Sequence, residues 1–297
     1  MLAIVIPYYK QTFFKATLQS LANQTDKRFH VYIGDDASPE NPKKLLEFYK
    51  DTLDFHYTRF ETNLGGISLV KQWERCLEMV QNEVWVMILG DDDTLGPNVV
   101  ASFYENLEFL EKEKSTVVRF ATQVINEYGD VISKVYKHPK TELASNFLLR
   151  KFKGGTRSSL SEYVFKKDKI TTVKFKDFPL AWSSDTLAVV EFSGGNPIFT
   201  INSALVFFRL SGKNITGQGD SIEKNKAWFQ FYSYLLSKYG KQYSNELLEK
   251  LFDRLEKVQL NNKKTPLRWL KLFWLYIVFF KYSRFLSLFK KIKQSIL

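Results

Sequence analysis

Cysteine, long apolar runs and glycine-rich nucleotide motifs are scarce in this chain of 297 residues. The single cysteine, Cys76, excludes an internal disulfide and is typical of a protein from a reducing compartment. It falls within a helical pattern of apolar residues, which favours a place in the core over a role as a nucleophile. The apolar start of the chain is short and has no basic segment, so we expect a buried first strand and not a signal peptide.

Other absences exclude further classes of protein. No Gly-x-Gly-x-x-Gly sequence follows the first predicted strand, which disfavours dehydrogenases and methyltransferases with a dinucleotide-type fold. The three histidines do not have the spacing of metal ligands. Residues 272–280 form an apolar run of nine residues, whereas a membrane-spanning helix needs about 20.

The net charge of +11 is concentrated at the C-terminal end. Residues 263–297 contain nine Lys and Arg, many aromatic residues and no Asp or Glu. The rest of the chain is nearly neutral, which argues against a nucleic-acid-binding face on the fold. We expect residues 263–297 to lie on an anionic membrane surface as an amphipathic helical tail. A terminal helix packed on the protein, with a solvated basic face, is the alternative.

Short apolar runs alternate with helical patterns in the first half of the chain. This alternation predicts an α/β fold with a mostly parallel central sheet covered by helices. Strands are predicted at residues 3–6, 29–33, 55–60, 84–89 and 115–122, and helices at 15–22, 42–53, 68–80 and 98–112. Later residues predict a hairpin at 124–136, strands at 163–165 and 204–210, a helix at 181–192 and a mobile loop at 211–219. We expect a catalytic domain over residues 1–220, a helical extension over 221–262 and the tail over 263–297.

Three adjacent carboxylates, Asp91, Asp92 and Asp93, directly follow the fully apolar predicted strand at 84–89. Because they repel one another, their charge requires a cation or extensive hydrogen bonding. Mg²⁺ and Mn²⁺ prefer oxygen ligands and bridge phosphate groups, so an Asp-x-Asp pair suffices to hold one. The alternative is a solvated acidic turn in which Asp93 caps the next helix.

A second acidic pair, Asp35 and Asp36, follows the predicted strand at 29–33. Ligands of open α/β sheets bind at the carboxyl ends of the strands, so both acidic segments are expected on one edge. Pro7 ends the first strand, and the aromatic residues Tyr8 and Tyr9 are placed to face a nucleobase there. Packing within a loop or core is the alternative for these two residues.

Together these segments resemble the family 2 glycosyltransferases, which have the GT-A fold. The resemblance covers roughly the first hundred residues. It rests on Ile4-Val5-Ile6-Pro7-Tyr8-Tyr9, Leu18-Gln19-Ser20-Leu21 with Gln24, Asp35-Asp36-Ala37-Ser38, Asn63-Leu64-Gly65-Gly66, and Gly90-Asp91-Asp92-Asp93 with Pro97. It implies an inverting transferase that uses a nucleoside-diphosphate sugar, such as a UDP-hexose or UDP-N-acetylhexosamine, with Mn²⁺ or Mg²⁺.

The resemblance also implies roles for particular residues. Asp36 would contact the base, often uracil, and Asp92 would lie beside the ribose or the donor sugar. The metal would be held by Asp91 and Asp93. Pro7, Tyr9 and Lys71 would face the nucleotide. In two places the chain departs from the family pattern: Lys10 replaces the usual Asn, and Gly90 stands where many members have Asp.

An inverting transfer requires a general base that accepts the proton of the acceptor hydroxyl. Asp185 is the predicted base, because it begins a helical pattern about a hundred residues after the acidic motif, as the family's base does. A helix-capping role is the alternative for Asp185, and Asp177 and Glu191 are alternative bases. Arg209, beside the predicted mobile loop, is expected to contact the diphosphate; an ordinary surface loop is the alternative.

The resemblance further implies a glycan or lipid-linked acceptor in surface polysaccharide synthesis, with the protein on the cytoplasmic face of the membrane. Arg157, in a glycine-rich loop, is a candidate contact to that acceptor. A membrane-associated scaffold that binds the nucleotide sugar without catalysis is the competing hypothesis. A nucleic-acid-binding protein is a third, disfavoured by the distribution of charge.

Overall fold

The computed structural model describes residues 1–212, 214, 216–217, 219 and 221–294, with side chains up to residue 288. The chain divides into two compact units. The first contains residues 1–177 and 184–219, and the second contains residues 178–183 and 220–297. Four residues of the predicted loop and domain boundary (213, 215, 218 and 220) and the last three of the predicted tail (295–297) lie outside the described residues. The separate tail domain stays a prediction.

Within its described residues the first unit contains a nine-stranded sheet in the order β3-β2-β1-β4-β8-β6-β9-β5, and β7 also pairs with β9. The strands are Leu2–Tyr8 (β1), Phe29–Asp35 (β2), Phe55–Arg59 (β3), Trp85–Ile88 (β4), Thr94–Leu95 (β5), Val117–Ile125 (β6), Thr141–Glu142 (β7), Tyr163–Lys166 (β8) and Ile198–Arg209 (β9).

Strands β1 to β4 run parallel to one another, and β6 runs parallel to β9. Strand β8 runs antiparallel to both of its neighbours, β4 and β6. The predicted α/β class with a mostly parallel central sheet is confirmed. The regular alternation of strands and helices in the sequence predicts the parallel half of the sheet, because parallel neighbours must be joined by crossover connections. Strand β8 follows a long connection that contains the short strand β7 and a helix at Ala144–Phe152, and its antiparallel direction has no such signature in the sequence.

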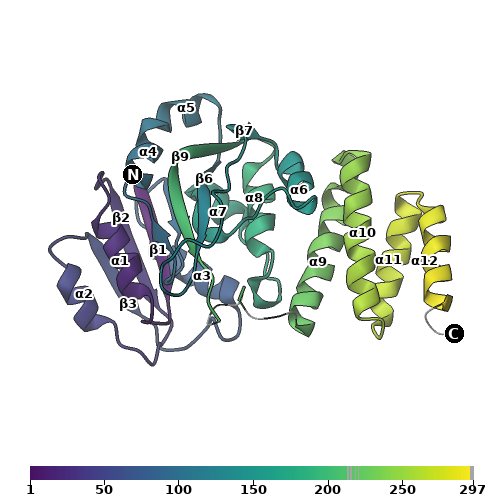
Figure 1. Ribbon diagram of the computed structural model, residues 1–297, viewed down its shortest axis with the longest axis horizontal. Helices are drawn as coiled ribbons and strands as arrows, with labels where there is room; N and C mark the ends of the chain where they lie inside the picture. Colours follow the sequence, from purple (N-terminus) through teal and green to yellow (C-terminus); the bar gives the residue numbers. More distant parts are fainter. Residues whose placement is uncertain (213, 215, 218, 220, 295–297) are drawn as a thin grey trace. The chain divides into compact units, whose positions relative to one another are not determined.

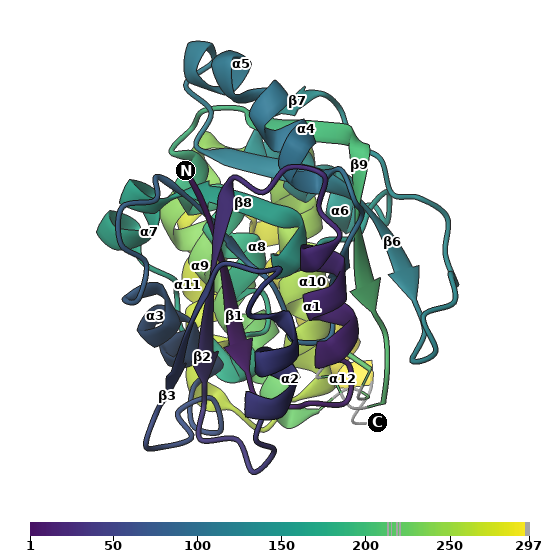
Figure 2. The same ribbon diagram turned by 90° about the vertical axis from the view of Figure 1, so that its left-hand side faces the viewer.

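Helices cover both faces of the parallel half, with α1 and α2 on one side and α3 on the other (Figure 2). The helices of the first unit are Phe14–Ala22 (α1), Lys43–Tyr49 (α2), Leu69–Leu77 (α3), Val99–Glu105 (α4), Leu107–Lys112 (α5), Ala144–Phe152 (α6), Lys167–Val173 (α7) and Ser184–Ser193 (α8), with a 3₁₀ turn at Leu160–Glu162 (η1). A sheet covered on both faces explains why β1 and β4 are apolar along their length.

Cys76 packs α3 against the sheet. A Cβ atom added to Gly34 of β2 would lie 2.3 Å from the Cys76 sulfur, so the helix approaches the strand closely only because residue 34 is glycine. Burial raises the pKa of the Cys76 thiol to about 12. The thiol is therefore protonated at neutral pH, as suits a core residue.

Two predicted helices differ from those in the structure. The helix expected at 98–112 is two helices, α4 and α5, which meet at Asn106, whose side-chain amide donates to the Ser102 carbonyl at 2.8 Å. The helix expected at 181–192 begins at Ser184, because Leu180, Ala181 and Ser183 all have positive φ angles.

Among its described residues the second unit contains four long helices. They lie in chain order in Figure 1. They are Ile222–Tyr239 (α9), Asn245–Asn261 (α10), Pro266–Val278 (α11) and Tyr282–Gln294 (α12), with 3₁₀ turns at Pro179–Ala181 (η2) and Gly240–Gln242 (η3). Ser221 and Ser244 cap α9 and α10, and Pro266 occupies the first turn of α11. Among the described residues, no helix has both the length and the apolar character that crossing a membrane requires.

Candidate active site

The two acidic segments predicted to converge meet at the carboxyl edge of the parallel strands. Strand β1 lies between β2 and β4 and pairs in parallel with both. The end of β1 then joins the two acidic segments through hydrogen bonds. The Asp36 amide donates to the Tyr8 carbonyl at 3.0 Å, and the Ser38 hydroxyl donates to the Tyr9 carbonyl at 2.6 Å. The Tyr9 amide donates to Asp91 Oδ2 at 2.8 Å.

The three carboxylates of the acidic motif have different surroundings. Asp91 is half-buried, and its Oδ2 accepts from the amides of Tyr9 and Lys10, each at 2.8 Å. Asp93 is 3% exposed, and each of its carboxylate oxygens accepts a hydrogen bond from a distant segment. Asp92 is half-buried, and its long hydrogen bond to another described side chain joins its Oδ2 to the side-chain amide of Asn214 at 3.4 Å. Among the three, Asp92 is thus the least engaged by the protein.

Removal from water raises the pKa of all three carboxyl groups. For Asp91 and Asp93 the pKa rises to about 7, and the neighbouring charge of Asp92 adds to the effect of burial. A group of carboxylates that is costly to ionise gains most from a cation. The donor set therefore suits a divalent ion.

The end of β9 supports the acidic motif from the other side. The Arg209 amide donates to Asp93 Oδ1, and its guanidinium donates to the carbonyls of Asp92 and Asn126, each at 2.8 Å. Arg209 is 4% exposed and lies over the ring of Phe13. Arg209 therefore stabilises the conformation of the acidic motif through hydrogen bonds. Its predicted contact with a diphosphate stays a prediction.

Ser161 of η1 bridges the two ends of the acidic turn. Its hydroxyl donates to Asp93 Oδ2 and accepts from the Gly90 amide at 3.1 Å. Ser161 is 4% exposed. Sequence reasoning missed this residue, because no local pattern marks a serine 68 residues away from its partner.

Asp36 anchors the turn before α3. Its Oδ1 accepts from the Leu64 amide at 2.7 Å and from Arg75 at 2.6 Å, and its Oδ2 accepts from the Gly65 amide at 2.8 Å. A Cβ atom on Gly65 would lie 2.6 Å from Asp36 Oδ2, which explains the glycine. Asp36 is 4% exposed and retains limited capacity for another donor.

The remaining predicted nucleotide contacts lie along the same edge. Pro7 is a half-buried residue of β1, and Tyr9, which is 36% exposed, directly follows that strand. Lys71 is an exposed residue in the first turn of α3, after the turn that Asp36 anchors. The roles of Pro7, Tyr9, Asp36 and Lys71 toward a ligand stay predictions.

Asp185, the predicted base, lies in the first turn of α8 and is half-buried. Its Oδ1 is 3.4 Å from the Thr186 hydroxyl. The placement of Asp185 relative to the acidic motif and its role as a base stay predictions. The alternative base Asp177 is bonded to the Ser68 hydroxyl at 2.8 Å.

Arg157, the candidate acceptor contact, belongs to a buried charged cluster. Its guanidinium lies 3.5 Å from Glu162 and over the ring of Phe208. Arg119, which is fully buried, pairs with Glu142 at 2.9 Å. Whether Arg157 contacts an acceptor stays a prediction.

The ionisable groups do not form a closed metal cage. Over the part of the chain that the structure describes, no group of three or more His, Cys, Asp or Glu side chains is arranged to hold a metal ion. An ion at the acidic motif would therefore take part of its ligands from a bound diphosphate or water.

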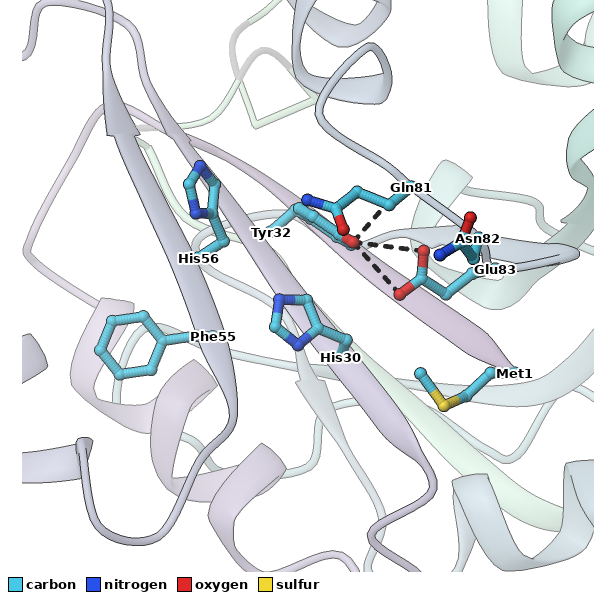
Figure 3. A pocket seen from close by; sticks show the side chains of 8 residues that line it. All are labelled: Met1, His30, Tyr32, Phe55, His56, Gln81, Asn82 and Glu83. Carbon is cyan, nitrogen blue, oxygen red and sulfur yellow. Dashed lines mark hydrogen bonds between the residues drawn. The ribbon is translucent and has the colours of Figure 1, made fainter.

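A pocket of about 340 Å³ lies at the opposite edge of the sheet (Figure 3). It is bordered by Met1, His30, Tyr32, Phe55, His56, Gln81, Asn82 and Glu83. These residues stand at or before the amino-terminal parts of β1 to β4, whereas the acidic segments follow the carboxyl ends. The Tyr32 hydroxyl points toward Glu83, 3.1 and 3.2 Å from its oxygens (Figure 3). This pocket is thus separate from the candidate site.

The mixed sheet with two acidic segments at the carboxyl ends of its parallel strands agrees with the fold that the sequence predicted. A family model described as "Glycosyl transferase family 2" matches residues 3–165. The chain belongs to this family and is a glycosyltransferase. None of the curated proteins compared with it matches the chain.

Solved structures share the fold at low sequence identity. S. aureus TarS 1–349 is 16% identical with a TM-score of 0.64, over 93% of this chain and 80% of that one. Its complex with UDP-GlcNAc is 14% identical with a TM-score of 0.63, over 86% and 71% of the two chains. GalNAc-T7 with UDP, GalNAc and Mn²⁺ is 12% identical with a TM-score of 0.55, over 89% and 56%. At these identities the likeness concerns the fold.

Proposed function

We propose that this glycosyltransferase moves a sugar, with inversion, from a nucleoside-diphosphate sugar to a hydroxyl group of a glycan or a lipid-linked acceptor. The observation that carries the proposal is the hydrogen-bonded edge on which Asp36 and the three carboxylates of the acidic motif meet. An edge of this kind offers separate places for a base, a ribose and a cation.

The proposed donor is a UDP-hexose or a UDP-N-acetylhexosamine. The proposal is supported by two of the similar structures, TarS with UDP-GlcNAc and GalNAc-T7 with UDP. In this chain Pro7, Tyr9, Asp36 and Lys71 are the proposed nucleotide contacts. The Asp36 carboxylate already accepts hydrogen bonds from Leu64, Gly65 and Arg75. It would accept one more hydrogen bond, from the base, through a remaining lone pair.

The proposed cofactor is Mn²⁺ or Mg²⁺, which when bound offsets the charge on the leaving diphosphate. Asp92 and Oδ1 of Asp91 are the proposed protein ligands, because they carry the fewest internal hydrogen bonds. The sequence favoured Asp91 and Asp93. We instead give Asp93 the role of holding the turn, since both of its oxygens already accept hydrogen bonds.

Asp185 is the proposed general base. The acceptor oxygen attacks the anomeric carbon opposite the diphosphate, the bond from that carbon to the diphosphate oxygen breaks, and the hydroxyl proton passes to the Asp185 carboxylate. Charge accumulates on the leaving diphosphate and partial positive charge on the sugar ring. Nearby carboxylates stabilise the ring charge electrostatically.

A role in surface polysaccharide synthesis at the cytoplasmic face of the membrane is the remaining part of the proposal. It is supported by the basic and aromatic composition of residues 263–297. The single cysteine, which is buried, suits a reducing compartment.

A donor screen tests the proposed reaction. With Mn²⁺, one UDP-sugar among UDP-, GDP- and dTDP-sugars is expected to raise the melting temperature by ~5 °C at a concentration of about a hundred times its Kd. Release of UDP in the presence of acceptor extracts then measures turnover. No shift with any sugar nucleotide would contradict the proposal. A shift without turnover, with every acceptor extract, would favour a non-catalytic scaffold.

Substitution of Ser161 tests how the acidic turn is held. Ser161→Ala leaves the Gly90 amide without its partner and removes a hydrogen bond from Asp93. The apparent Kd for Mn²⁺ is expected to rise by about tenfold or more, as when an outer ligand of a metal site is lost. Calorimetric titration with Mn²⁺ and UDP measures this change.

Ser159→Ala is the matched control for Ser161→Ala. Ser159 caps the same turn, but its hydroxyl bonds Glu162 and not the acidic motif. This variant is expected to lose stability while its affinity for Mn²⁺ stays the same. Equal Mn²⁺ affinity in Ser161→Ala and the wild type would remove Ser161 from the proposed site.

A further inference from the structure

Helix α11 has apolar residues on two opposite faces. One face is buried in the second unit: Leu272 and Leu275 are 0% exposed, and the ring of Tyr276 stacks on Phe252 of α10 with a centroid distance of 5.5 Å. A helix that is packed through one face only usually presents polar residues on the opposite face. Helix α11 instead has apolar residues there.

The opposite face carries large exposed apolar side chains. Their spacing of three, four and three residues places them in one stripe along the helix. The stripe is formed by Leu267, Leu270, Trp274 and Ile277, which are 79%, 64%, 47% and 60% exposed. Phe280, just after the helix, is 77% exposed. We call these five residues the α11 face. Single exposed apolar residues are ordinary, but a continuous stripe marks an interaction surface.

The cations of this region divide into two groups. Lys281 and Arg284 pair with Glu249, and Arg284 also pairs with Asp253 and Glu256, all of which lie on α10. These ion pairs join the start of α12 to α10. The two cations therefore stabilise the packing of the helices and are not available to a binding partner. The sequence alone had counted both cations among those that would face a membrane.

The other group borders the α11 face. Lys264 is exposed just before the helix, and the Lys271 ammonium lies 4.2 Å from the centroid of the Trp274 ring. Because residues 263–297 contain no Asp or Glu, no acidic side chain of that segment balances these charges. The surface is thus apolar along its length with positive charge at its side.

We propose that the α11 face is the membrane-binding surface of this protein and lies in the interface of an anionic bilayer, with Lys264 and Lys271 at the head groups. The proposal deepens the membrane part of the proposed function and rests on it. Apolar side chains of an in-plane helix insert beside the head groups, and lysines add attraction to anionic lipid. A second copy of the chain fits less well, because a symmetric contact would bring the same positive charges together.

Co-sedimentation of the full chain with vesicles tests the surface. The wild type is expected to bind vesicles containing anionic phosphatidylglycerol and to bind pure phosphatidylcholine vesicles more weakly. The double variant Leu270→Glu/Ile277→Glu is expected to bind the anionic vesicles at least about tenfold more weakly, because it places charge in the apolar stripe. The variant Lys264→Gln/Lys271→Gln is expected to lose about fivefold per lysine on anionic vesicles only.

Phe48→Glu is the matched control. Phe48 is an aromatic residue of α2 that is 73% exposed and belongs to the first unit. This variant is expected to bind vesicles as the wild type does. Thermal melting checks that every variant is folded, which is expected since the substituted side chains are exposed.

Two results would overturn the proposal. One is vesicle binding by Leu270→Glu/Ile277→Glu that equals that of the wild type. The other is a wild-type dimer in solution that this variant converts to a monomer without any vesicle binding in either form. Donor-dependent release of UDP with a soluble acceptor is measured separately. If the wild type binds vesicles but releases no UDP, the proposed reaction is contradicted and the proposed membrane-binding surface is not.

Discussion

Asp185→Asn is expected to bind the sugar nucleotide with wild-type affinity and to lower kcat by about 10³-fold. The amide keeps the size of the side chain but does not accept a proton. Asp185 lies in the first turn of α8, and its hydrogen bond within the described residues is a weak one from Thr186, so the substitution is expected to leave the fold intact. Single-turnover transfer and calorimetric binding of the UDP-sugar separate the chemical step from donor binding.

Asp177→Asn and Glu191→Gln are the matched variants, because both residues are alternative bases close to Asp185 in the sequence. Asp177 is bonded to the Ser68 hydroxyl, so its substitution is expected to alter stability more than kcat. Wild-type transfer by Asp185→Asn together with a large loss in one of the other two would move the base to that residue.

Asp92→Asn is expected to remove most of the activity, and EDTA is expected to do the same to the wild type until Mn²⁺ or Mg²⁺ is added back. Loss of cation charge at the leaving diphosphate is worth several kcal/mol in the transition state, which corresponds to roughly 10³-fold in rate. Within the described residues, the contact of the Asp92 carboxylate with another side chain is the long one to Asn214, at 3.4 Å. Turnover and Mn²⁺ affinity are the measurements.

Asp93→Asn distinguishes the two assignments of the metal ligands. Asp93 accepts hydrogen bonds from Ser161 and Arg209, so this variant is expected to lose more folding stability than affinity for Mn²⁺. A loss of Mn²⁺ affinity in Asp93→Asn but not in Asp92→Asn would instead support the pair that the sequence favoured.

The affinity for Mn²⁺ is expected to increase as the pH rises from 6 to 8. The pKa of Asp91 is raised to about 7 and that of Asp92 is also raised, so protons compete with the cation at both proposed ligands at low pH and compete less as the pH rises. Titrations in two buffers of different ionisation enthalpy measure the protons released. Affinity that does not change with pH would contradict proton competition at these carboxylates.

The features that sequence reasoning predicted well are local. Five of the strands and most helices of the first half follow from apolar periodicity, since the fully buried strands β1 and β4 are continuous apolar runs. The convergence of Asp36 with Asp91, Asp92 and Asp93 followed from one rule, because parallel neighbours end at the same edge. The two-residue strands β5 and β7 were missed, since a pair of residues has no detectable period.

The features that it missed depend on contacts between distant segments. Ser161 and Arg209 reach Asp93 across 68 and 116 residues of sequence. Arg75 contacts Asp36 from α3, so Asp36 has more partners within the protein than its motif suggests. No local sequence pattern near any of these residues indicates which distant residue it contacts.

The sequence by itself determined the α/β class, the placing of carboxylates at strand ends and the basic, aromatic character of residues 263–297, because each follows from the order of residue types along a short stretch. Only the tertiary structure decided which carboxylate of the acidic motif has the fewest described hydrogen bonds and which cations of residues 263–297 are paired with α10. Hydrogen bonds and ion pairs between elements make those choices, and their partners are brought together only when the whole chain is folded.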